Sequence, residues 1–325
     1  MRCLSFLFVA TLVIAPAMAG AADLMPTTTW TPAQEQQAIQ QWRQERDESL
    51  RRADGWLTLV GLEWLKQGIN RIGSGSDNDI KLTVGPDYWG SIELDNRALT
   101  FVRAAGSDIT IDGAGIDGAG IDGAGIDGTG VDGTTPERVA LVADDTGEPT
   151  MIRSGASGFY VIFRESYALR VFDNQAQALA NFKGVQNYDI QPDWRISGRF
   201  TPASAGQTID IGNVLGQVSA TPVYGVFEFE RDGRNYQLIG LGEETSKNVW
   251  FIFSDRTSGK GTYGAGRFLY SEGLPENGRL VVDFNKAYNP PCAFNDYATC
   301  PLPPQENRLD LAVTAGEKDA HSAGQ

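Results

Sequence analysis

The chain has 325 residues, of which 41% are hydrophobic, and a formal net charge of −14. This length is enough for one large domain or two ordinary ones, each with its own hydrophobic core. The acidic balance argues against nucleic acid and anionic membrane surfaces as partners, because both are bound through clustered Lys and Arg side chains.

The N-terminal residues have the pattern of a secretory signal. Arg2 supplies a positive charge, residues 4–14 form a hydrophobic run, and residues 17–19 fit the small-x-small cleavage rule. The run is shorter than the roughly 20 residues that span a bilayer. We therefore expect a cleaved signal peptide at residues 1–19 and a periplasmic or secreted mature protein without membrane insertion. Loss of the one positive charge of Arg2 changes the net charge from −14 to −15.

One long helix is predicted at the start of the mature chain. Residues 31–34, Thr-Pro-Ala-Gln, form a capping box with proline at the first helical position. Hydrophobic side chains then recur at helical spacing through about Arg52: Ala38, Ile39, Trp42 and Leu50. The opposite face is crowded with charged residues, which we interpret as a solvated surface.

The rest of the chain has the pattern of short strands separated by turns. Strands are expected at residues 56–60, 70–72, 108–111, 138–142, 159–164, 167–173, 196–200, 209–211, 226–230, 236–241, 249–253, 280–284 and 309–313. The sequence thus predicts a mainly β protein of two packed β units with one N-terminal helix. The first unit is a sandwich-like unit at residues 30–182 that includes the helix, and the second spans 183–318. Residues 319–325 are expected to be disordered.

Residues 71–80, Arg-Ile-Gly-Ser-Gly-Ser-Asp-Asn-Asp-Ile, resemble the start of a forkhead-associated domain, a β-sandwich that binds phosphothreonine peptides. The resemblance implies a sandwich topology for the first unit. In that family an arginine follows the first glycine, and a later serine and histidine complete the phosphate site. Here Ser74 occupies the arginine position and the only histidine is His321. Phosphopeptide binding is therefore not implied, since a phosphate site needs its arginine fork.

Residues 111–133 contain a five-residue repeat, IDGAG, that admits three interpretations. A pentapeptide-repeat β-helix matches loosely, but such solenoids need several stacked coils. Calcium binding is a second interpretation, because hard cations take carboxylate oxygens; the candidates are Asp112, Asp117, Asp122, Asp127 and Asp132. The high glycine content favours the third, a passive pentapeptide-repeat insertion in a hairpin loop.

Removal of the signal peptide leaves two cysteines, Cys292 and Cys300. In an oxidising compartment a pair eight positions apart indicates a disulfide. The alternative is a metal pair, but zinc needs about four soft or imidazole ligands. We expect the disulfide and no metal site.

The absence of histidine from the body of the chain excludes Ser–His–Asp and Cys–His catalysis, which need an imidazole base. Neither a phosphate-loop motif nor a G-x-S-x-G elbow is present. Carboxylate, lysine, tyrosine and arginine chemistry remains, and these residues are densest at positions 255–289. The candidate ligand-binding residues are Tyr263, Arg267, Asp283, Asn285 and Tyr288.

Strand alternation places Asp283 on the same face as Val281, where a carboxylate among hydrophobic residues needs a partner. Arg267 and Lys286 are the candidates for it. One interpretation is a structural ion pair at a strand end. In the other, Arg267 holds a substrate carboxylate or sugar oxygen, Asp283 serves as a base, and the two tyrosines form an amphipathic wall.

The run at residues 283–309, DFNKAYNPPCAFNDYATCPLPPQENRL, preceded by TYGAGRFL at 262–269, resembles the bacterial family known as domain of unknown function 1684. The resemblance is strongest from residue 182 to 318. It implies a secreted or envelope-associated β-rich protein, and it does not imply a particular activity.

We therefore expect an exported binding protein without a cofactor. Its cleft, in the C-terminal unit, would take a small molecule, sugar, peptide or other cell-envelope component. The alternative is a histidine-independent hydrolase or transferase that uses Asp283 with Asp255 or Glu317.

Overall fold

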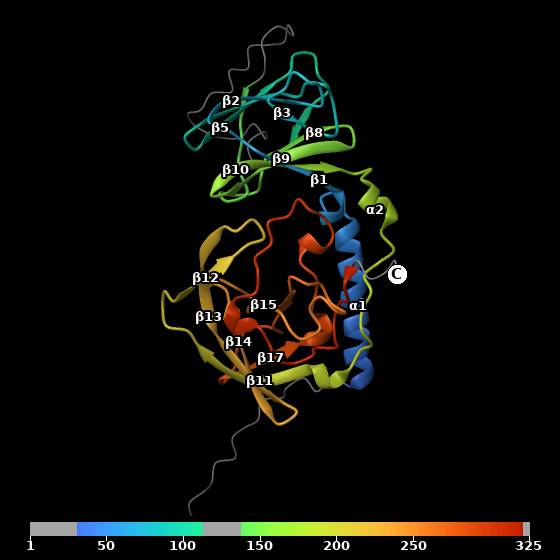
Figure 1. The fold of residues 1–325 in the computed structure, drawn as a ribbon, viewed down its shortest axis with the longest axis vertical. Coiled ribbons are helices and arrows are strands. Elements are labelled where there is room, and N and C mark those ends of the chain that lie inside the picture. The colour runs from blue at the N-terminus through green and yellow to red at the C-terminus, as the bar shows by residue number, and fades with distance from the viewer. Residues whose placement is uncertain (1–30, 113–137, 321–325) are drawn as a thin grey trace, which may run out of the picture.

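The computed structural model describes residues 31–112 and 138–320 (Figure 1). The predicted signal peptide, the repeat from residue 113 onward and residues 321–325 of the tail lie outside the described residues. The calcium and β-helix interpretations fall there as well. Within the described ranges, no helix combines the length and hydrophobicity that crossing a membrane requires.

Helix α1 (Pro32–Arg51) begins as the sequence predicts. The Thr31 side chain accepts from Gln34 N at 3.3 Å, and Gln34 Oε1 accepts from Thr31 N at 2.8 Å. This reciprocal capping satisfies two backbone donors that a helix start leaves unpaired. Ile39 and Leu50 of the predicted hydrophobic stripe are buried.

The N-terminal β unit is a sandwich of two sheets around one core. One sheet has the order β1-β10-β9-β8-β6 and the other the order β3-β2-β4-β5-β7. Side chains from both sheets, including Ile72, Ile92, Phe159 and Leu169, meet in the core. The strands are β1 (Leu59–Trp64), β2 (Gly68–Gly73), β3 (Ile80–Lys81), β4 (Gly90–Asp95), β5 (Ala98–Arg103), β6 (Thr110–Asp112), β7 (Arg138–Ala140), β8 (Met151–Ser154), β9 (Ser157–Arg164) and β10 (Ser166–Asp173).

The C-terminal β unit is a sheet that closes on itself. Its order is β16-β15-β14-β13-β11-β17, with β12 paired to β13. Beyond the strand ends, Glu272 N donates to Val281 O at 2.9 Å and Ser271 bridges Val282, which joins the two edges. The strands are β11 (Arg195–Pro202), β12 (Thr208–Gly212), β13 (Val218–Arg231), β14 (Arg234–Leu241), β15 (Trp250–Phe253), β16 (Arg267–Tyr270) and β17 (Arg279–Asp283).

Each predicted strand overlaps an observed one except residues 309–313, where the prediction is wrong. The alternating side chains of this segment do pack into the core of the closed sheet, together with Phe227, Phe251 and Val282. The backbone is irregular there: Leu309 N donates to Ser254 O, Leu311 O accepts from Arg256 N, and Val313 O accepts from the buried Arg267 side chain.

Short helices connect the strands. They are α2 (Gln177–Asn181), η1 (Trp56–Thr58), η2 (Pro192–Trp194), η3 (Phe284–Lys286), η4 (Pro291–Ala293) and η5 (Gln305–Asn307). The predicted disulfide between Cys292 and Cys300 is present. Both cysteines pack with Ile252 and Phe268 from the outer face of the closed sheet, so the disulfide loop covers that face.

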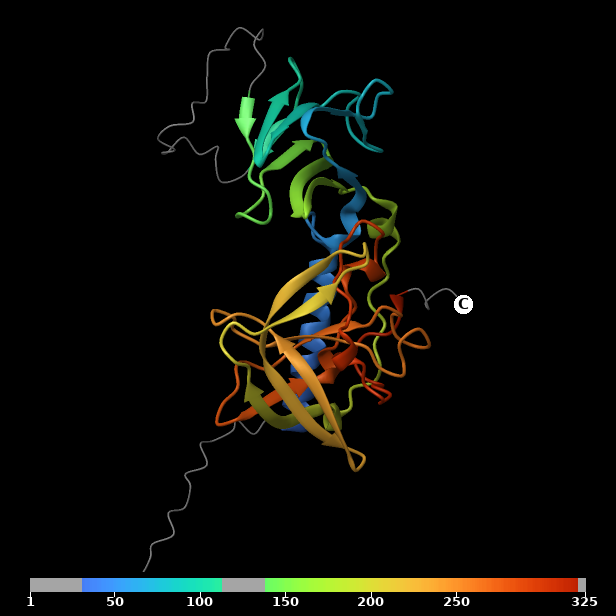
Figure 2. The same ribbon diagram turned by 60° about the vertical axis from the view of Figure 1, so that its left-hand side comes forward.

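Helix α1 runs along the C-terminal unit in both views (Figures 1 and 2). Arg43 Nη2 donates to Tyr188 O at 2.9 Å, and Asp47 Oδ1 accepts from Val185 N at 2.9 Å. The sequence predicts this helix as part of the unit at residues 30–182. The structure differs, because the charged face interpreted as solvated finds its partners on the C-terminal unit.

Candidate functional site

Arg267 lies at the start of β16 with its side chain fully buried. Its Nη2 is 2.8 Å from Asp255 Oδ2 and 3.0 Å from Val313 O, and its Nη1 donates to Ala315 O. Burial lowers the pKa of Arg267, and the charge of Asp255 opposes that effect. Arg267 therefore holds the C-terminal segment inside the closed sheet, with Asp255 rather than Asp283 as its ion-pair partner.

Asp283 and Asn285 form a local cap where β17 ends. Asp283 Oδ1 accepts from the backbone N of Asn285 at 3.0 Å and from its Nδ2 at 2.9 Å, and Asn285 Nδ2 also donates to Gln191 O. Burial of Asp283, which is 2% exposed, raises the pKa of its carboxyl group. Lys286 Nζ lies 3.4 Å from Glu272 Oε1, so Lys286 forms an ion pair with Glu272.

The two candidate tyrosines lie in different surroundings. Tyr263 Oη donates to Cys292 O in the disulfide loop at 3.0 Å. Tyr288 packs beneath α1, with its ring 6.4 Å from the ring of Trp42 and 5.0 Å from the Arg46 guanidinium. Burial raises the pKa of Tyr288 strongly. None of the five predicted site residues lines the hollow beside α1 that is described below.

The carboxylates named for the alternative hydrolase or transferase are also enclosed. Asp255 is held by Arg267, and both Asp283 and Glu317 are almost completely buried. None of these three carboxylates lines the hollow beside α1 that is described below. The hydrolase or transferase stays a prediction.

Glu317 fastens α1 to the closed sheet. The sequence suggests this residue only as a catalytic partner of Asp283. Its Oε1 accepts from Arg46 Nε at 3.0 Å and its Oε2 accepts from Asn289 N at 2.7 Å. Arg46 Nη2 donates to Asn289 O at 2.9 Å, which completes the clamp. Burial raises the pKa of Glu317, and the charge of Arg46 opposes that rise.

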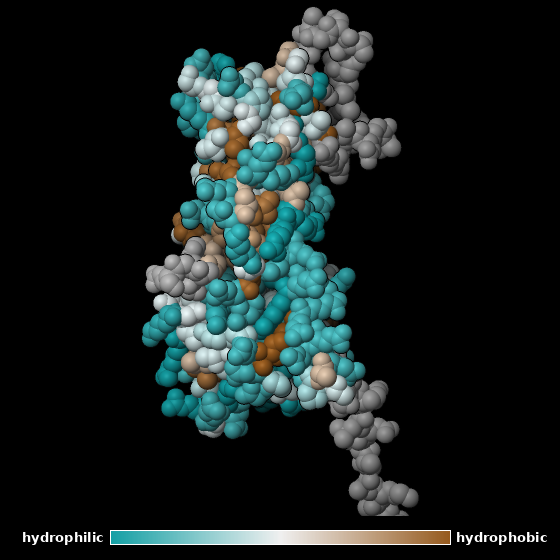
Figure 3. Space-filling view, turned by 90° about the vertical axis from the view of Figure 1, so that its right-hand side faces the viewer, coloured by the Kyte–Doolittle hydropathy of each residue, from teal (hydrophilic) through white to brown (hydrophobic). Residues whose placement is uncertain are grey.

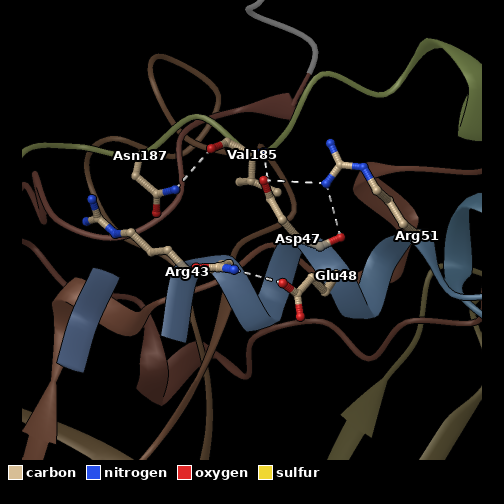
Figure 4. Close-up of a pocket in the computed structure, with 7 residues that line it drawn as sticks. Arg43, Asp47, Glu48, Arg51, Val185 and Asn187 are labelled. Carbon is tan, nitrogen blue, oxygen red and sulfur yellow. Dashed lines mark hydrogen bonds and ion pairs between the residues drawn. The ribbon is translucent and has the colours of Figure 1, made fainter. Parts of the chain in front are cut away.

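A hollow of about 550 Å³ lies between α1 and residues 185–187 (Figure 4). We call it the α1 hollow. Its lining consists of Arg43, Gln44, Asp47, Glu48, Arg51, Val185 and Asn187. Two arginines and two carboxylates balance one another. The side of the molecule that carries α1 has a mainly hydrophilic surface with small hydrophobic patches (Figure 3).

Hydrogen bonds order the lining. Asp47 accepts from Val185 N and also pairs with Arg51 at 3.7 Å. Asn187 Nδ2 donates to Val185 O at 3.1 Å, which fixes the orientation of the Asn187 amide. The Asp47–Val185 hydrogen bond joins α1 to residues 185–187, and the Asn187–Val185 hydrogen bond orders that segment.

Two polar atoms of the lining are buried and have no hydrogen-bond partner within the described protein. They are Arg43 Nε, a donor, and Asn187 Oδ1, an acceptor. Burial lowers the pKa of Arg43, while the charges of Asp283, Asp189 and Glu317 oppose that effect. Neither residue belongs to a recognisable sequence motif. Arg43 also lies on the charged helix face, for which the sequence predicts a solvated surface.

The family comparison concerns the C-terminal unit. Residues 180–318, less than half of the chain, match the family described as "Protein of unknown function (DUF1684)". These residues are thus similar to that family, and we refer to them below as the DUF1684 domain. The search of curated proteins gave no match. A solution NMR structure of an uncharacterized protein from Haloarcula marismortui is 29% identical over 43% of this chain and 78% of that chain, with a TM-score of 0.37.

The DUF1684 domain supplies only one side of the α1 hollow. Val185 and Asn187 lie within the matched residues, whereas Arg43 and Asp47 come from α1, outside them. The clamp likewise joins Glu317 of the DUF1684 domain to Arg46 of the helix. Among residues 31–112 and 138–320, no group of three or more His, Cys, Asp or Glu side chains is arranged to hold a metal ion.

Proposed function

We propose that the protein is an exported binding protein for an uncharged sugar, which it holds in the α1 hollow. One observation carries the proposal: two residues that line the same hollow each have a buried polar atom without a partner in the described protein, the donor Arg43 Nε and the acceptor Asn187 Oδ1. Buried polar atoms in proteins are nearly always hydrogen-bonded. A hydroxyl group accepts one hydrogen bond while it donates another, so it complements both atoms.

The charge balance of the lining supports an uncharged ligand. Arg43 and Arg51 oppose Asp47 and Glu48, and further carboxylates lie near Arg43. An anionic ligand would meet those carboxylates, and a cationic one would meet the two guanidinium groups. The volume of about 550 Å³ is within the range of small-molecule pockets, which hold roughly 300–1,000 Å³.

The composition of the hollow sets the expected affinity. Val185 is its only hydrophobic lining residue, so little hydrophobic burial accompanies binding. Hydrogen bonds to a sugar replace hydrogen bonds to water, and their net contribution is small. We expect a Kd on the order of 1 mM. Export is part of the proposal because residues 1–19 have the pattern of a signal peptide.

The test is a thermal-shift titration of the chain from Gly20 with N-acetyl-D-glucosamine and D-glucose. At tenfold excess over the Kd, binding adds about 1.4 kcal/mol to the free energy of unfolding, which raises Tm by roughly 2–4 °C. The charged analogues D-glucuronate and D-glucosamine should give smaller shifts.

Two variants make the test specific. Asn187→Ala removes the buried acceptor and should abolish the shift. Gln41→Ala is the matched control, because Gln41 is exposed on α1, donates to Glu45 and does not line the α1 hollow. Neutral sugars also raise Tm by exclusion from protein surfaces, and that effect is the same in both variants. An equal shift in Asn187→Ala and wild type contradicts the proposal.

A further inference from the structure

A buried cation lies at the junction of the two β units. Arg170 is in β10 and is only 4% exposed. Its chain neighbours Leu169 and Val171 point into the sandwich core, so strand alternation places Arg170 on the opposite face of this sheet. In Figure 1, β9 and β10 form the side of the sandwich nearest the C-terminal unit.

Aromatic rings, rather than a carboxylate, surround the guanidinium. Its Cζ atom is 5.1 Å from the ring centroid of Trp56 and 5.8 Å from that of Tyr160. Its Nη1 donates to Tyr160 Oη at 3.4 Å, and its buried Nε has no partner in the described protein. No ion pair joins Arg170 to a carboxylate in residues 31–112 or 138–320. Glu63, in the adjacent strand, pairs with Leu169 and points to the other face.

The contrast with Arg267 shows why this arrangement calls for a partner. Arg267 is equally buried, but it has a carboxylate, Asp255, at 2.8 Å. A buried charge without a counter-charge is strongly unfavourable, and cation–π contacts compensate for only part of the lost hydration. The rings contact the guanidinium, and its Nε–H remains without an acceptor.

We propose that Arg170, with Trp56 and Tyr160, binds a small oxyanion at the junction of the two units, through carboxylate or phosphate oxygens. A guanidinium edge presents paired N–H donors that match the oxygens of such an anion. The anion supplies both the missing charge and an acceptor for Nε. The site lies at the junction, where polar contacts such as that of Arg164 Nε with Thr299 Oγ1 at 3.2 Å join the units.

The test compares wild type with Arg170→Met, which keeps an unbranched hydrophobic side chain and removes the charge. Inorganic phosphate and acetate are titrated separately at matched ionic strength, and Tm is followed. Wild type should be stabilised in a saturable manner by one or both anions, and Arg170→Met should not respond. The control is Arg199→Met, because Arg199 is an exposed residue paired with Glu228 and should respond as wild type.

A second variant covers the case in which Arg170→Met does not fold. Arg170→Lys keeps the charge but not the planar fork, so its anion affinity should fall by about tenfold while the protein stays folded. Stabilisation by phosphate that is larger than that by acetate assigns a phosphate site, and the reverse assigns a carboxylate site. Equal responses of wild type and Arg170→Lys, or no response of wild type to either anion, overturn the proposal.

Discussion

The clamp between α1 and the DUF1684 domain gives the sharpest prediction for stability. Replacing Glu317 by leucine removes the acceptor of two hydrogen bonds, one from Asn289 N at 2.7 Å and one from Arg46 Nε at 3.0 Å. The Arg46 side chain, only 15% exposed, would then have lost its carboxylate. Removing one partner of a buried ion pair costs about 3–5 kcal/mol, and we expect about 4 kcal/mol here.

Arg46→Met should be less damaging, at about 3 kcal/mol, because the isolated Glu317 avoids a buried charge by protonation. In the double variant neither charge is left unpaired. Its loss should therefore be about 4–5 kcal/mol, well below the sum of the single losses.

The assay is a double-mutant cycle by urea unfolding at pH 7, read from the transition of the C-terminal unit. The expected coupling energy between the two positions is about 2–3 kcal/mol. Losses that add to within about 0.5 kcal/mol would show that α1 is not fastened by this pair.

Two further predictions concern the C-terminal unit. Burial raises the pKa of Asp283, so the folded state favours its protonated form, and this contribution to stability is lost as pH rises through the folded pKa. Asp283→Asn keeps an acceptor for Asn285 but does not titrate, so it should gain stability relative to wild type as pH rises. Urea titrations from pH 3 to 8 measure this, and a difference in free energy of unfolding that stays constant with pH would refute it. Cys292→Ser with Cys300→Ser opens a nine-residue ring and should lower the free energy of unfolding by about 2.5 kcal/mol. Mass analysis of the unreduced protein should show both cysteines resistant to alkylation, and two alkylated thiols would contradict the link.

Local features of the fold were predictable because local residues determine them. The capping box at Thr31 and Gln34 uses side chains three positions apart, and strand alternation needs only neighbouring residues. The disulfide was predictable from the count of two cysteines in an expected oxidising compartment. Residues 309–313 show the limit: their alternation is real, but their backbone hydrogen bonds go to Ser254, Arg256 and the Arg267 side chain, all more than forty positions earlier.

The candidate site was less predictable, because side-chain chemistry in a sequence does not reveal burial. Arg267 and Asp283 belong to the densest polar cluster in the chain, yet both are enclosed and bound by protein groups. The α1 hollow combines Arg43 with Asn187, and the Arg43–Tyr188 hydrogen bond spans 145 positions. Only the packing of the helix on the DUF1684 domain brings those residues together.

The most direct test of a sugar site in the α1 hollow is a ¹⁵N NMR titration of the chain from Gly20 with N-acetyl-D-glucosamine, observing the Arg43 Nε–H and Asn187 side-chain resonances. In wild type, both signals should shift in a saturable manner. In Asn187→Ala, the Arg43 Nε–H signal should not shift. Shifts confined to other residues, or none at sugar concentrations well above 1 mM, would contradict it.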